Sequence, residues 1–71
     1  MSYNGHKNWN HWNVSLWIHN DEVLYRLARR CANSGTRRQA AETFLELVGS
    51  PKTPDGAPYS LSSVTAAMRG L

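Results

Sequence analysis

The same spacing of apolar residues occurs twice in the middle of this chain. In both segments apolar side chains recur at offsets of zero, one, four, five and eight, which places them on one face of an α-helix. The two sets are Val23, Leu24, Leu27, Ala28 and Cys31, and then Ala40, Ala41, Phe44, Leu45 and Val48. These stripes predict two amphipathic helices that bury their apolar faces in a shared core.

The first of these helices has signals at both ends. Asn20 is expected to cap its start, and Asp21 and Glu22 then lie in the first turn, where the helix dipole favours carboxylates. Gly35 is expected to end it, because glycine adopts the left-handed conformation that terminates helices. The sequence therefore predicts a helix between Asn20 and Gly35.

The second helix begins at a two-residue capping motif. Thr36 and Gln39 form a capping box, in which each side chain accepts a hydrogen bond from the other residue's backbone N–H. Gly49 and Pro51 end this helix, and residues 49–59 form a rigid loop with all three prolines and a Thr-Pro-Asp-Gly turn. Ser60 is expected to cap a last short helix, and Gly70 to end it. The apolar residues of this segment are Leu61, Val64, Met68 and Leu71.

Another helix is expected near the N-terminus, where three tryptophans occur within nine residues. Asn8 is a capping residue, and Trp9, Trp12, Leu16 and Trp17 share one helical face after it. A small domain needs large anchors, so Trp12, Leu16 and Trp17 are expected to pack into the core. Trp9 lies among polar residues at the start of the helix, and we expect it to be exposed as an anchor for a partner.

Together these segments predict an all-α fold of three to four short helices, with one domain over residues 1–71 and an N-terminal arm over residues 1–8. A chain of 71 residues is too short for a two-domain enzyme. Its apolar runs fall short of the roughly 20 residues that cross a bilayer, and the N-terminus lacks a signal-peptide pattern. With Cys31 as its single cysteine, the chain is expected in a reducing cytoplasm.

Five of the eight basic residues lie between positions 26 and 38, at the end of one predicted helix and the start of the next. They are Arg26, Arg29, Arg30, Arg37 and Arg38. Arginine at this density suits phosphates or carboxylates, because the guanidinium binds both in a bidentate manner. A simpler interpretation is a solvated face, in which Glu22 pairs with Arg26 and Arg38 with Glu42 at favourable helical spacings.

The residues that carry catalysis or bind metals form no recognisable motif. His6, His11, His19 and Cys31 lack the short paired spacings of a structural zinc site, so we expect no metal and no cofactor. Glycine-rich phosphate loops and nucleophile motifs are absent, which predicts that the protein is not an enzyme. Asp55 is expected to cap the backbone of its own turn.

The segment from Tyr3 to Glu22, Tyr-Asn-Gly-His-Lys-Asn-Trp-Asn-His-Trp-Asn-Val-Ser-Leu-Trp-Ile-His-Asn-Asp-Glu, resembles a family of small proteins encoded by phages, plasmids and integrated elements. The family pattern is Tyr-Asn-Gly, then Asn-Tyr-x-Thr-Trp-x-Val-x-Leu-Trp, then an Asn-Asp/Glu segment. This chain has Trp9 in place of the family's tyrosine and His11 in place of its threonine. The resemblance implies a mobile element acting in a bacterial cell, where small proteins without enzymatic activity often act as counter-defence factors.

The leading hypothesis is therefore an anti-CRISPR-like inhibitor that binds a host defence complex stoichiometrically by protein–protein contact. The alternative is a small basic nucleic-acid-binding protein, with Arg37 and Arg38 on phosphates and Trp9 stacked on a base. Either protein could be a monomer or a homodimer. The candidate partner-binding residues are Arg26, Arg29, Arg30, Arg37, Arg38, Trp9 and His11.

Overall fold

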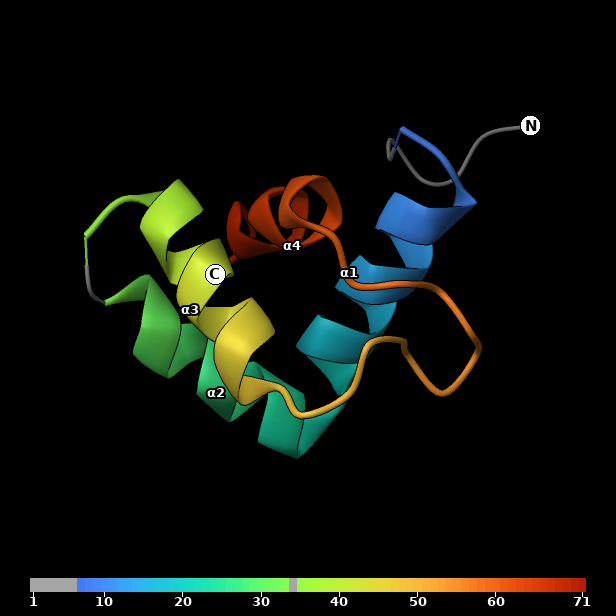
Figure 1. Ribbon diagram of the computed structural model, residues 1–71, viewed down its shortest axis with the longest axis horizontal. Helices are drawn as coiled ribbons and strands as arrows, with labels where there is room; N and C mark the ends of the chain where they lie inside the picture. Colours follow the sequence, from blue (N-terminus) through green and yellow to red (C-terminus); the bar gives the residue numbers. More distant parts are fainter. Residues whose placement is uncertain (1–6, 34) are drawn as a thin grey trace.

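Four helices follow one another in a ring in the computed structural model (Figure 1). The structure describes residues 7–33 and 35–71, so most of the expected arm over residues 1–8 lies outside the described residues. The helices are α1 (Trp9–Asn20), α2 (Glu22–Ala32), α3 (Arg37–Leu47) and α4 (Leu61–Met68). Consecutive helices pack together, and α4 also packs against α1, which closes the ring. The fold is all-α, as predicted.

Side-chain caps set the starts of three helices as the sequence predicts. Asn8 Oδ1 accepts a hydrogen bond from the His11 N–H at 3.0 Å and begins α1. At the start of α3, the Thr36 hydroxyl and the Gln39 side chain accept each other's backbone N–H at 3.2 and 3.0 Å. Ser60 caps α4. Each cap satisfies an N–H that the helix itself leaves unpaired.

The cap of α2 is Asp21, so the prediction of Asn20 is wrong. Asp21 Oδ1 accepts a hydrogen bond from the Leu24 N–H at 3.1 Å, while the Asp21 N–H donates to the Trp17 carbonyl at 2.9 Å. Asn20 is instead the last residue of α1, and its Nδ2 donates to the Leu16 carbonyl. One residue thus ends α1 and begins α2, which fixes a sharp turn between them.

The core lies inside the ring, and the predicted stripes of α3 and α4 face it. Phe44 is the largest fully buried side chain, and its ring meets Tyr59 edge-on with the centroids 5.8 Å apart. Burying a side chain of this size contributes roughly 2–3 kcal/mol. The buried apolar residues are Val14, Ile18, Ala28, Cys31, Ala40, Ala41, Phe44, Ala57, Val64, Ala67 and Met68.

The predicted apolar face of α1 is wrong. Val14 and Ile18 are the fully buried apolar residues of this helix, whereas Leu16 is 39% exposed. Trp9 is 40% exposed, which confirms that its side chain lies at the surface. Hydrogen bonds from α1 to the 49–59 loop fix its rotation, and they turn Val14 and Ile18 inward instead of the tryptophan face. No tryptophan of the described chain belongs to the buried core.

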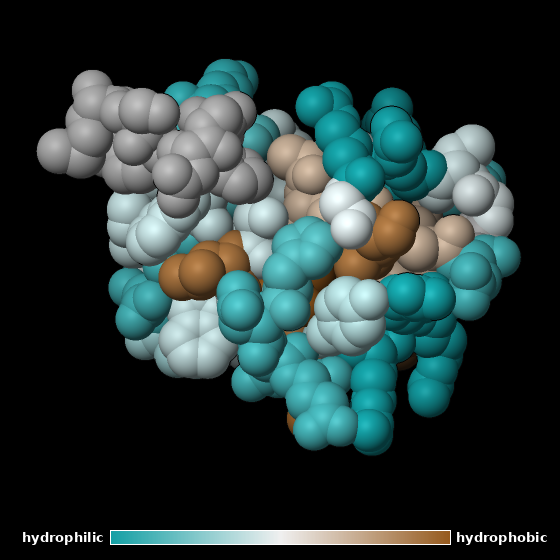
Figure 2. Space-filling view, turned by 180° about the vertical axis from the view of Figure 1, so that it is seen from behind, coloured by the Kyte–Doolittle hydropathy of each residue, from teal (hydrophilic) through white to brown (hydrophobic). Residues whose placement is uncertain are grey.

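The predicted stripe of α2 is wrong at Val23, whose side chain is 75% exposed. Leu24 and Leu27 are partly buried against the core, and Ala28 and Cys31 are buried. Val23 lies in the first turn of α2, at the rim of a shallow hollow that Pro54 also lines. Viewed from behind the orientation of Figure 1, the surface is mostly hydrophilic, with apolar side chains in separate areas (Figure 2).

The loop over residues 49–59 forms a tight turn that reaches α1 before the chain enters α4 (Figure 1). The Gly56 N–H donates to the Thr53 carbonyl at 2.8 Å, and the Thr53 N–H donates to the Ala57 carbonyl at 2.8 Å. Gly56 has a φ of +92°, a conformation that glycine adopts without strain. Lys52 and Pro58 form an antiparallel bridge, so the turn closes like a very short hairpin.

Candidate functional site

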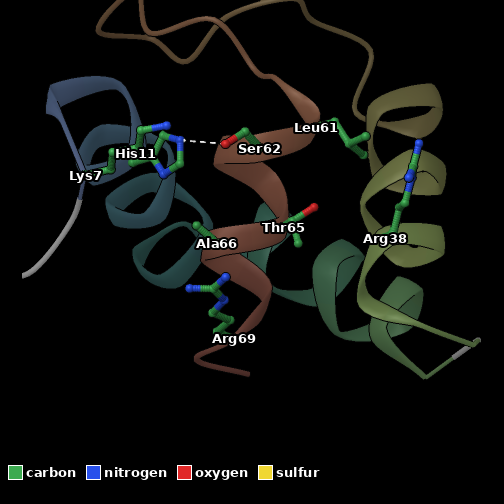
Figure 3. Close-up of a pocket in the computed structure, with 8 residues that line it drawn as sticks. All are labelled: Lys7, His11, Arg38, Leu61, Ser62, Thr65, Ala66 and Arg69. Carbon is green, nitrogen blue, oxygen red and sulfur yellow. Dashed lines mark hydrogen bonds between the residues drawn. The ribbon is translucent and has the colours of Figure 1, made fainter.

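A groove of about 890 Å³ runs beside α4, between α1 and α3. Figure 3 shows α4 at its centre, with Lys7 and His11 on the side of α1 and Arg38 on α3. Arg69, the residue after α4, lies at the end of the groove near the C-terminus. The remaining lining residues are Leu61, Ser62, Thr65 and Ala66. We call this the α4 groove.

A hydrogen bond between two of these side chains links α1 to α4 at the α4 groove. Ser62 Oγ and His11 Nε2 are 3.0 Å apart (Figure 3). This contact fixes the imidazole on the same side of α4 as Lys7, while Arg38 lies across α4 on α3 (Figure 3). No acidic side chain lies among the residues that line the groove. Its cationic side chains, Lys7, Arg38 and Arg69, suit an anionic ligand.

A second, smaller groove of about 280 Å³ lies where α2, α3 and the C-terminal residues meet. Arg29 enters it from α2 and Arg37 from α3, and Arg69 lines it as well. We call it the C-terminal groove. Arg69 therefore lines both grooves, and together they form a surface that we call the α4 surface.

The α4 surface is strongly cationic although the net charge of the chain is only +3. Five of the eight lysines and arginines line its two grooves, and none of the five acidic residues does. Asp21 and Glu22 are engaged in capping α2 and in an ion pair with Arg26. The cationic residues of the surface are Lys7, Arg29, Arg37, Arg38 and Arg69.

The candidate residues named from the sequence divide into two groups. His11 and Arg38 line the α4 groove, and Arg29 and Arg37 line the C-terminal groove. The other three, Arg26, Arg30 and Trp9, are exposed and line neither groove. Arg26 pairs with Glu22 on the surface of α2, as the solvated-face interpretation predicts.

Arg29 is held in place by its own helix. Its Nη1 donates to the Tyr25 hydroxyl at 3.1 Å, and its guanidinium carbon lies 5.8 Å from the centre of the Tyr25 ring. A guanidinium positioned over an aromatic ring is favoured electrostatically and loses less freedom when a ligand binds. Arg29 therefore presents a partly ordered charge to the C-terminal groove.

Sequence reasoning missed Lys7 and Arg69. Arg69 is the most central residue of the α4 surface, but it lies 31 positions after Arg38 and directly follows a helix without charged residues. Only the closure of the ring by α4 brings it beside the other arginines. The one local signal is its position before Gly70 at the end of a helix, where a cation is favoured by the dipole.

A polar network on the other side of α1 holds the helix to the 49–59 loop. Asp55 Oδ2 accepts hydrogen bonds from Asn13 Nδ2 and Trp17 Nε1, each at 2.9 Å. The Thr53 hydroxyl donates to Asn13 Oδ1 at 2.6 Å. These donors stabilise the carboxylate and lower the pKa of Asp55. The expectation that Asp55 caps its own turn is wrong, because its side chain binds α1.

Cys31 belongs to the buried core. Cys31 is buried, and burial raises the pKa of its thiol, so the reactive thiolate is disfavoured. Among residues 7–33 and 35–71, no three histidine, cysteine or acidic side chains cluster closely enough to hold a metal ion. Within that same part of the chain, no helix has the length and apolar character needed to span a bilayer.

Comparison with known proteins adds one relationship. A search of curated proteins and a search of solved structures found no match to this chain. A family of unknown function, DUF7249, matches residues 1–68, which include all four helices and all but the last three residues of the chain. The match covers nearly the whole sequence, and the protein therefore belongs to the family of unknown function DUF7249.

Proposed function

We propose that this protein is a stoichiometric inhibitor that binds a host defence complex, in the manner of an anti-CRISPR protein. The observation that carries the proposal is the α4 surface, on which five cationic side chains line two adjoining grooves without an acidic side chain. The resemblance of residues 3–22 to proteins of mobile elements supplies the setting, a bacterial cell that defends itself.

The size of the protein fits this role. A specific interface buries about 800 Å² on each partner, and the whole accessible surface here is 4576 Å². One partner would therefore cover roughly a sixth of the molecule, which is close to one complete side. Because the cations come from α2, from α3, from Lys7 two positions before α1 and from the residue after α4, the folded ring is needed to present them together.

An affinity capture experiment tests the proposal. The tagged protein is incubated with bacterial lysate, with and without nuclease, and bound proteins are identified by mass spectrometry. We expect one host complex to be retained after nuclease treatment and to be bound at a fixed stoichiometry. Purified protein should then inhibit the activity of that complex. Failure of the wild-type protein to retain or inhibit any complex would refute the proposal.

Two matched variants make the experiment specific for the α4 surface. Arg38→Glu reverses a charge in the α4 groove, while Arg30→Glu reverses the charge of an exposed arginine outside both grooves. We expect Arg38→Glu to lose the host complex and Arg30→Glu to retain it. Circular dichroism spectra of both variants should match the wild type, because neither side chain is buried.

Nucleic-acid binding is the second candidate, and the same cations favour it, since arginine also binds phosphates in a bidentate manner. In that case the captured material would disappear on nuclease treatment. Binding to unrelated duplexes would weaken steeply with salt, because each neutralised phosphate releases counterions. Absence of duplex binding at low salt would rule this candidate out.

A further inference from the structure

Arg69 occupies the most central position on the α4 surface. It follows α4 directly, and it lines the α4 groove together with Arg38 and the C-terminal groove together with Arg29 and Arg37. The residue is exposed, and the hydrogen bond of its own N–H goes to the backbone of Ala66. A ligand that runs along α4 from one groove to the other must therefore pass Arg69.

The α4 groove is not lined by charge alone. Leu61 and Ala66 contribute apolar side chains, and Thr65 contributes a side chain with a methyl group, all from α4 itself. Figure 3 shows these residues between His11 on one side and Arg38 on the other. A ligand that fills this groove contacts apolar surface in the middle and cations at the edges. A sugar–phosphate backbone repeats phosphates between small sugar rings and has no apolar side chains, whereas a peptide can carry both carboxylates and apolar side chains.

The charges next to the groove also discriminate between anionic ligands. Glu42 and Glu46 follow Arg38 at steps of four residues along α3, so the three side chains lie on one face of that helix. Both glutamates are exposed. A nucleic-acid duplex placed over Arg38 would bring phosphates close to both, and like charges repel. A short ligand confined to the grooves avoids them.

From this arrangement we propose that the α4 surface binds a short acidic segment of a partner protein, with Arg69 as its central contact. The proposal rests on the proposed function and names the chemistry of the partner at the same surface. Carboxylates of the segment pair with Arg38, Arg69 and the arginines of the C-terminal groove, and apolar side chains of the segment contact Leu61 and Ala66.

The length of such a segment follows from the helix. α4 has eight residues and is about 12 Å long at 1.5 Å per residue. An extended peptide advances about 3.3 Å per residue, so about four residues run beside α4 and a few more reach into the C-terminal groove. Side chains alternate in an extended peptide, which places carboxylates on one side and apolar groups on the other.

The test is a titration of the isotope-labelled full chain, followed by NMR. The probe is a short synthetic peptide in which glutamate alternates with leucine, and the controls are the same peptide with glutamine for glutamate and an oligothymidylate of equal charge. We expect the acidic peptide to shift the backbone signals of residues 61–71 and of Arg37 and Arg38. The glutamine peptide should cause no shifts, and the oligothymidylate should bind more weakly than the acidic peptide.

Three arginine variants show whether Arg69 is central. We expect Arg69→Glu to weaken binding of the acidic peptide about tenfold or more. Arg30→Glu should change the peptide affinity less than about twofold, because Arg30 lines neither groove. Arg69→Gln removes the charge without reversing it, so its peptide affinity should lie between those of the other two variants. Equal effects of Arg69→Glu and Arg30→Glu would overturn the proposal, as would tighter binding of oligothymidylate or shifts confined to other helices.

Failure of the acidic-segment proposal can be distinguished from failure of the proposed function. If a host complex is captured and inhibited but Arg69→Glu binds it as well as the wild type, the function stands and the acidic segment is refuted. If the acidic peptide binds as described and no host complex is captured or inhibited, the proposed function fails while the chemistry of the surface holds.

Discussion

Replacing Asn13 by alanine should destabilise the protein strongly, although asparagine is a polar residue in a helix. The Asn13 side chain is 1% exposed and makes two hydrogen bonds, to Asp55 Oδ2 at 2.9 Å and to the Thr53 hydroxyl at 2.6 Å. Each hydrogen bond contributes about 1 kcal/mol, and leaving the buried Thr53 hydroxyl without its acceptor costs about 1 kcal/mol more. We therefore expect Asn13→Ala to lower the free energy of unfolding by roughly 3 kcal/mol.

That loss is large for a protein of this size. A chain of 71 residues has a free energy of unfolding of about 4–10 kcal/mol, and each kcal/mol lost lowers the melting temperature by about 4–8 °C. The assay is urea unfolding followed by circular dichroism. Asn20→Ala is the matched control, because Asn20 is exposed and bonds only within α1, and it should change stability by less than about 0.5 kcal/mol. Equal stabilities of the two variants would refute the role assigned to the network.

Three further predictions concern the core and the titratable groups. Phe44→Ala should lower the free energy of unfolding, measured in urea, by about 3–5 kcal/mol, because Phe44 is fully buried in the core between the helices. A loss below about 1 kcal/mol would contradict that placement. The lowered pKa of Asp55 means that its carboxylate stabilises the fold fully above the unfolded pKa of about 4 and loses this effect as the pH falls through the lower folded value. The free energy of unfolding should therefore fall less steeply with decreasing pH in Asp55→Asn than in the wild type. Identical pH profiles would count against the network. The Cys31 thiol should react with a thiol reagent far more slowly in the native protein than in urea, and equal rates would show that it is accessible.

Much of this fold is predictable from local sequence signals, and the wrong face predicted for α1 comes from contacts that are distant in the sequence. The caps at Asn8, Thr36 and Ser60 act within three or four residues, so they can be identified without the tertiary structure. The rotation of α1 depends on Asn13 and Trp17 bonding to Asp55, about 40 positions away. A periodicity that counts only apolar residues assigns the tryptophans to the core and ignores the asparagines that fix the helix.

The candidate site shows the same limit. The density of arginines between positions 26 and 38 indicates a cationic surface, and four of the seven candidate residues do line the two grooves. Neighbouring positions on a helix diverge by about 100°, so Arg29 reaches the C-terminal groove while Arg30 does not. Arg69 joins the surface only because α4 packs against both α1 and α3. The clustering of arginines in the sequence predicts neither the difference between Arg29 and Arg30 nor the position of Arg69.

The proposed function places a host complex on the α4 surface, with Arg69 at the centre of the contact. The most direct measurement compares the dissociation constants of the wild type, Arg69→Glu and Arg30→Glu for the complex captured from nuclease-treated lysate. We expect Arg69→Glu to weaken binding by about tenfold or more, and Arg30→Glu to stay within about twofold of the wild type. Unchanged binding by Arg69→Glu, or an equal loss in both variants, would contradict this placement.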